Sequence, residues 1–184
     1  LGAEVENPGF AIDATGAAWL ASDNLASGSQ PFYTVDLATG AARLVGELGR
    51  DLQGLMAVGR ALYGINDEEP GLFRVDPRRG TATRLATLRA PFQGDCPSLE
   101  VAPNGDWIAL NDAGAIFLVD PATGDAGLVA TTRAGFESLA IPQHQVCAYA
   151  IDSDVGDQLH VIDLRTGASI AIGAVGFTDV EGLA

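Results

Sequence analysis

Asp120-Pro-Ala-Thr-Gly124 is the clearest copy of a turn sequence that occurs four times in the chain, once in roughly every forty residues. The Asp side chain can accept backbone N–H groups at the entry to the turn, and Pro fixes φ at the next position. Gly supplies the positive φ that closes a type I turn followed by a G1 bulge. Each copy therefore predicts a tight β-hairpin. The other copies are Asp36-Leu-Ala-Thr-Gly40, Asp76-Pro-Arg-Arg-Gly80 and Asp163-Leu-Arg-Thr-Gly167.

Each hairpin is the second half of a unit that contains four short apolar segments, separated by Gly, Pro and Asn turns. None of the segments has a convincing helical period. We therefore predict four β-strands in each unit. In chain order the predicted strands are 9–12, 18–21, 32–35 and 42–45; 54–58, 62–65, 72–75 and 82–85; 98–101, 107–110, 116–119 and 126–129; and 138–141, 147–150, 159–162 and 169–172.

A four-stranded meander that repeats at this period predicts an all-β fold, a β-propeller of four-stranded antiparallel blades. One blade cannot bury both of its faces, but a stack of blades can. A β-sandwich and a β-solenoid are the alternatives. Sandwich strands do not normally return to one turn sequence four times, and solenoid coils usually have about 20 to 30 residues. The predicted blades cover about 5–49, 50–92, 93–134 and 135–176.

Residues 177–184 match the opening of a fifth unit, because Gly182-Leu183 aligns with Gly54-Leu55. Leu1 is not an initiating Met, so we expect a mature form, an excised domain or a fragment. We predict a longer propeller; a four-bladed ring and a ring completed by a second copy are the alternatives. An open arc would expose apolar blade faces, which favours self-association.

The charge is strongly acidic, with 24 acidic residues, ten basic residues and a net charge of −14. Phosphate backbones would be repelled, which argues against a nucleic-acid partner. A protein partner, a small cationic ligand or a metal ion fits better, although simple solubility also explains the excess. No run of about 18 apolar residues is present, so we expect no membrane insertion.

The repeat resembles the repeats of bacterial secreted and cell-surface propellers of the quinoprotein-like and strictosidine-synthase-like kind. Asp120-Pro-Ala-Thr-Gly124 and Asp179-Val-Glu-Gly-Leu183 carry this resemblance, which covers nearly the whole chain. It implies a secreted, periplasmic or cell-surface bacterial protein with a binding or scaffold role. It transfers no catalytic residue.

The predicted topology places an acidic surface on one face of the propeller. Loops that enter the first strand of each blade, and loops between the second and third strands, share that face. We expect the opposite face to collect Arg60, Arg78, Arg79, Arg165 and His144. The candidate binding residues on the acidic face are Glu6, Asp51, Asp95, Glu137, Asp179 and Glu181.

Calcium is the cofactor that this surface suggests, because Ca²⁺ takes six to eight oxygen ligands. Glu6, Glu137 and Glu181 precede first strands near the predicted axis, although solvated loop acids, or acids that accept neighbouring strand N–H groups, explain them better. The segment with Asp152, Asp154 and Asp157 resembles a calcium loop but lacks the downstream Glu of an EF-hand.

No catalytic constellation is present in the sequence: nucleophile elbow, phosphate loop, HExxH and paired CxxC are all missing. His160 occupies a column held elsewhere by aromatic residues, so we predict that it packs there, and His144 lies in a turn. We therefore predict a non-enzymatic binding or scaffold domain whose ligand or partner meets the acidic face. The alternatives are a metal-assisted hydrolase or lyase that uses axial carboxylates, and a structural surface or filament component.

Cys96 and Cys147 lie near opposite ends of their strands in the predicted register, roughly 17 Å apart at about 3.3 Å per residue. A disulfide needs Cα atoms within about 7 Å, so we predict that the two are not bonded. Four aromatic residues fall in or near one strand column, which favours packing between blades: Trp19, Tyr63, Trp107 and Tyr149.

Overall fold

The computed structural model describes residues 5–23, 28, 30–66, 70–89, 98–142, 144–145, 147–152, 156–177 and 183, without the side chains of residues 6 and 7. In this part of the chain every regular element is a β-strand. The strands form four separate antiparallel sheets of four strands each, paired in chain order within each sheet. The prediction of a β-propeller with four-stranded blades is confirmed. No described segment is a helix of the length and apolarity needed to cross a membrane.

The strand bounds follow the predicted units closely, and we call the sheets blades 1 to 4. Blade 1 has β1 (Glu6–Ile12), β2 (Ala18–Asp23), β3 (Pro31–Val35) and β4 (Ala42–Glu47). Blade 2 has β5 (Gly54–Val58), β6 (Ala61–Asn66), β7 (Gly71–Asp76) and β8 (Thr81–Thr87). Blade 3 has β9 (Ser98–Val101), β10 (Trp107–Leu110), β11 (Ala115–Val119) and β12 (Ala126–Thr131). Blade 4 has β13 (Phe136–Ala140), β14 (Cys147–Asp152), β15 (Gln158–Asp163) and β16 (Ser169–Ala174).

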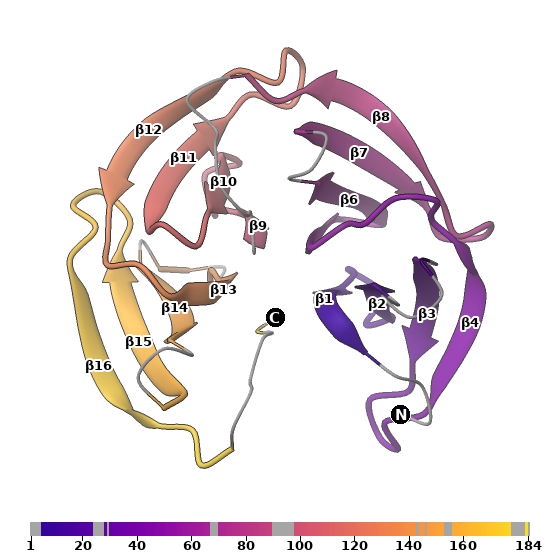
Figure 1. The fold of residues 1–184 in the computed structure, drawn as a ribbon, viewed down its shortest axis with the longest axis horizontal. Helices are drawn as coiled ribbons and strands as arrows, with labels where there is room; N and C mark the ends of the chain where they lie inside the picture. The colour runs from indigo at the N-terminus through magenta and orange to yellow at the C-terminus, as the bar shows by residue number, and fades with distance from the viewer. Residues whose placement is uncertain are drawn as a thin grey trace.

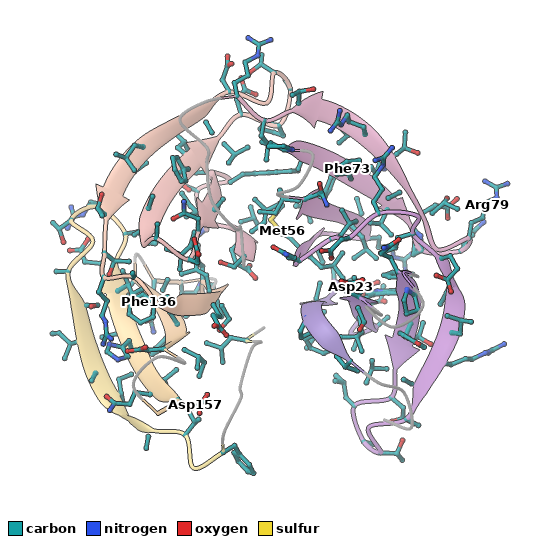
Figure 2. All side chains as sticks on the ribbon, viewed as in Figure 1. Asp23, Met56, Phe73, Arg79, Phe136 and Asp157 are labelled. Atoms are coloured by element: carbon teal, nitrogen blue, oxygen red, sulfur yellow. The ribbon has the colours of Figure 1, made fainter. Side chains whose placement is uncertain are left out.

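The blades surround a common axis, with the first strand of each blade innermost and the last strand at the rim (Figure 1). Among the described residues, the first strands pack in the order β1, β5, β9 and β13, and Figure 1 shows a gap between the strands of blade 4 and those of blade 1. Figure 2 shows Met56 of β5 near the axis and Arg79, in the β7–β8 turn, at the outer rim. The axis is therefore lined by β1, β5, β9 and β13.

Apolar side chains between neighbouring blades form the core. Met56 of blade 2 is fully buried and packs in one cluster with Leu99 and Trp107 of blade 3. Tyr63 meets the Trp107 ring edge-on, with ring centroids 4.7 Å apart, which confirms packing between blades for this pair. Burying one such side chain contributes about 1.5–3 kcal/mol, so the blades are stabilised mainly by each other.

The repeated turns have the expected Asp and Gly chemistry. In the first copy, Ala38 N–H donates to Asp36 Oδ1 at 2.8 Å, and Gly40, at a φ of 71°, donates its N–H to Asp36 O at 2.7 Å. Asp36 N–H donates to Ala41 O, so four residues are enclosed. A type I turn with a G1 bulge has a three-residue loop, whereas this loop has four residues, of which Gly40 is the last.

The turn glycine also sets the distance between neighbouring blades. A Cβ on Gly124 would overlap the Thr87 carbonyl oxygen at the end of blade 2, and one on Gly167 would overlap the Thr131 carbonyl oxygen at the end of blade 3. Gly40 has the same backbone conformation but nothing within reach. The turn between the third and fourth strands can therefore contact the preceding blade this closely only if it has Gly at this position.

We expect Gly124→Ala to lower the free energy of unfolding by about 2–4 kcal/mol, because left-handed strain of about 1–2 kcal/mol adds to the overlap with Thr87. Urea unfolding measures this loss. Gly40→Ala is the matched control, since it carries the strain without the overlap. Equal losses in the two variants would show that the blade contact contributes nothing.

Candidate functional site

The acidic-face residues are only partly within the described chain. Asp51 and Glu137 are described and half-buried, and Asn66 Nδ2 donates to the Asp51 carbonyl at 2.6 Å. The Glu6 side chain and Asp95, Asp179 and Glu181 lie outside the described residues. Among the side chains that are described, no three His, Cys, Asp or Glu residues come together as a metal site. Calcium at this face stays a prediction.

One aspartate of the segment that resembles a calcium loop forms an ion pair with an arginine from outside that segment. Asp152 is fully buried, and its Oδ2 lies 2.5 Å from Nη1 of Arg133. Asp157 is also buried and has a positive φ of 51°, whereas Asp154 lies outside the described residues. Asp152 therefore serves as the counter-ion of Arg133.

His160 packs beside that ion pair. It is 4% exposed and meets the Phe136 ring edge-on, with ring centroids 5.0 Å apart. Burial and the Arg133 charge lower the pKa of His160, while Asp152 acts in the opposite direction. The imidazole is therefore neutral near pH 7, and its packing in the aromatic column is confirmed.

The charges on the opposite face differ from the expected basic surface. The antiparallel order puts the turns after the first and third strands of each blade on that face. The four repeated Asp residues are in those turns with the arginines, and Arg79 Nη1 lies 3.3 Å from Asp76 Oδ2. Exposed His144 also lies in such a turn. The arginines and His144 therefore lie on the face predicted for them, but the turn aspartates lie there too, so that face carries both charges.

Cys147 is a free thiol, and its Sγ donates to Gln145 Oε1 at 3.0 Å. Cys96 lies outside the described residues.

A cavity with a volume of about 540 Å³ lies at the propeller axis. Its walls come from all four blades and are mostly apolar. Glu100 of β9 supplies a carboxyl group and Tyr149 of β14 an aromatic side chain. The remaining described lining residues are Ala11, Ile12, Ala57, Val101, Ala140, Ile141, Pro142, Leu159 and Leu183.

The cavity lies toward the ends of the innermost strands, away from the acidic face. Phe10, Leu55, Leu99 and Leu139 come one or two residues before the cavity-lining part of each strand and line a much smaller space of about 20 Å³. Such a space is of the size of a single water molecule. These four residues lie nearer the acidic-face ends of their strands than the residues that line the larger cavity, so the larger cavity belongs to the opposite end.

Glu100 is the site residue that the sequence predictions missed. Burial raises its pKa to about 8, against a smaller opposing effect of the Val101 N–H that its carboxylate accepts. The strand pairings align Glu100 with Ala11, Met56 and Ala140 in the other blades. A carboxyl group in an otherwise apolar column was a signal available in the sequence.

Comparisons with known proteins place the chain by its fold alone. No family model and no curated protein matches it. Hydrazine synthase of Kuenenia stuttgartiensis aligns with a TM-score of 0.62 and 18% identity over 94% of this chain and 51% of that one. A Bacteroides thetaiotaomicron protein of unknown function aligns with a TM-score of 0.67 and 13% identity, over 93% and 48%. TolB of Acinetobacter baumannii aligns with a TM-score of 0.57 and 14% identity, over 95% and 44%.

The chain thus spans about half the length of these solved structures. All three come from bacteria, and at these identities the likeness concerns the fold. The finer resemblance to quinoprotein-like or strictosidine-synthase-like propellers stays a prediction.

Proposed function

We propose that this chain is a non-enzymatic binding module of an exported bacterial protein, and that a small, largely apolar ligand occupies the axial cavity. The observation that carries this proposal is the cavity of about 540 Å³, with apolar walls and one carboxyl group. Ligand sites typically have about 300–1,000 Å³ and combine apolar walls with few polar groups. Binding at the acidic face, with or without Ca²⁺, is a separate proposal for the predicted residues there.

The described residues favour binding over catalysis. Near the axis they offer Glu100 and Tyr149, without a nucleophile and base in hydrogen-bond contact. His160 is enclosed between blades 3 and 4, and His144 is exposed in a turn. Acid–base chemistry needs a group within hydrogen-bond reach of the substrate, which neither histidine provides in the cavity.

The proposal is tested with the neutral apolar fluorophore N-phenyl-1-naphthylamine. Its emission should rise on addition of the protein, because the cavity removes it from water. Ala140→Phe should fill part of the cavity and weaken binding about tenfold or more. Ala38→Phe, at an exposed turn position, is the matched control and should bind as the unaltered chain does. Absence of binding, or equal binding by both variants, would reject the cavity as the site.

A second candidate function, assembly through blade faces, is favoured by the open side of blade 1. Phe73 and Phe117 are buried in the contacts that blades 2 and 3 make with the preceding blade, at 0% and 2% exposure. Tyr33 holds the equivalent position in blade 1 but is only half-buried, and Gly40 has no neighbour. We propose that this face binds the open face of blade 4 in another copy, where Ile170 is 69% exposed.

We expect the mass in solution to rise with concentration between about 1 µM and 1 mM, and Tyr33→Asp to weaken association about tenfold or more. Light scattering coupled to size exclusion measures both. Leu128→Asp is the matched control, because Leu128 is exposed but belongs to blade 3, which has neighbours on both sides. A monomer at every concentration would reject assembly and leave ligand binding untouched.

A further inference from the structure

We infer that the axial cavity selects organic amines, namely ammonium cations with an apolar body, and that the Glu100 carboxylate is their counter-ion. This inference rests on the proposed function, since it requires the cavity to be a ligand site. It adds the chemical class of the ligand and the residue that selects it.

Glu100 stands between the two axial cavities and lines both of them. Its carboxylate accepts the N–H of Val101 on its own strand. An ionised carboxylate has about four acceptor positions, so this bond leaves capacity for a ligand that donates. The geometry thus combines a cavity of ligand size with an acceptor on its wall.

The surroundings of Glu100 contain no other charge among the described lining residues of either cavity. The strands facing it contribute Ala11 and Ile12 from β1, Ala57 from β5, and Ala140 from β13. Tyr149 is the other titratable side chain of these described walls. On the acidic-face side the polar lining groups are Gln53, Ser98 and Ser138, all neutral.

An apolar wall that raises the pKa of Glu100 to about 8 favours the protonated acid in the empty cavity. An ammonium group supplies the missing positive charge, so the carboxyl group loses its proton to water and forms a charge-assisted hydrogen bond. A neutral ligand gains only an ordinary hydrogen bond, and an anion loses its hydration in a cavity whose described walls hold no cation to pair with it. A Ca²⁺ ion needs six to eight oxygen ligands, which the described walls do not provide.

The test uses three probes of nearly equal shape: 2-phenylethylamine, 2-phenylethanol and phenylacetate. Each is titrated against bound N-phenyl-1-naphthylamine. We expect the amine to bind about ten to a hundred times more tightly than the alcohol, and phenylacetate to bind most weakly. Glu100→Gln should remove the preference for the amine and leave alcohol binding within about threefold. Glu47→Gln, at an exposed position of β4, is the matched control for the lost charge.

Proton release gives a second readout that is independent of affinity. Between about pH 6 and 8 the amine should release up to one proton per site on binding, because Glu100 gives up its proton and the amine keeps its own. Calorimetry in buffers of different ionisation enthalpy measures it. Amine affinity should rise about tenfold per pH unit over this range, while alcohol affinity should stay nearly constant.

The outcomes separate the inference from the proposed function. If the fluorophore binds but amine and alcohol compete equally, or if Glu100→Gln keeps the preference, the amine inference is overturned and the cavity remains a ligand site. If the fluorophore does not bind, the proposed function itself fails. Circular dichroism checks folding, and Glu100→Met repeats the test with the side chain that blade 2 has at this position.

Discussion

Glu100→Met is expected to raise the free energy of unfolding by about 3 kcal/mol at pH 7, and to change it much less near pH 4. Burial raises the pKa of Glu100 from 4.5 to about 8, so between these values the folded state binds a proton that the unfolded state releases. The unfolding free energy of the unaltered chain must therefore fall as pH rises through this interval. At pH 7 the interval covers about 2.5 pH units, at about 1.36 kcal/mol each.

Urea unfolding at about pH 4, 7 and 9 measures this effect, and the gain from Glu100→Met should grow with pH and level off above about pH 8. Met is the appropriate replacement because Met56 fills the same register position in blade 2 and is 1% exposed there. Glu47→Met, at an exposed site, controls for the lost charge. A gain of equal size at every pH would show that packing, and not the raised pKa of the Glu100 carboxyl group, is responsible.

This expected gain bears on function. The other three blades have Ala or Met at the register position of Glu100. A carboxyl group at this position destabilises the fold at neutral pH, so Glu100 departs from the packing of the other blades. Such breaks are expected at binding sites, where a ligand compensates for the loss. Binding of an amine would return part of the stability that Glu100 removes, so ligand affinity and unfolding free energy are two measurements of one electrostatic effect.

The blades could be predicted from the sequence because their signals are local. Asp36 and Gly40 define a turn within a few residues, and the apolar segments around them define strands. The role of Glu100 could not be predicted in the same way. That role depends on whether the side chain at this register position faces the cavity, and the packing of the blades determines this. Glu100 lines the cavity, whereas Met56, at the same register position in blade 2, is buried against blade 3.

Asp152 shows a second limit of sequence reasoning. Its neighbours in sequence indicate a polar calcium-type loop. Its partner Arg133 precedes β13, whereas Asp152 is the last residue of β14, so the two are far apart in the sequence. In blades 2 and 3 the same register position holds Asn66 and Asn111, and both are buried. The repeat therefore predicts a buried polar residue at this register position. The arginine that pairs with it can be identified only from the three-dimensional structure.

Arg133→Met is expected to lower the free energy of unfolding by about 3–5 kcal/mol near pH 8, because it leaves the fully buried Asp152 carboxylate without its cation. His160 Nε2 lies 3.7 Å from Asp152 Oδ2. Without Arg133 the remaining carboxylate should raise the pKa of His160, so that a protonated imidazole replaces the lost cation. That stabilisation is present below the unfolded pKa of about 6.5 and disappears as pH rises through the folded value.

The loss measured by urea unfolding should therefore be smaller near pH 5.5 than near pH 8. Asp152→Asn combined with Arg133→Met should recover most of the stability, because the pair is then replaced by the neutral residue that blades 2 and 3 already accommodate. Double-mutant coupling of about 2 kcal/mol or more follows. Additive losses would contradict the ion pair as the stabilising unit and would leave only the stacking of Arg133 on the Phe136 ring, where the guanidinium carbon lies 5.7 Å from the ring centroid.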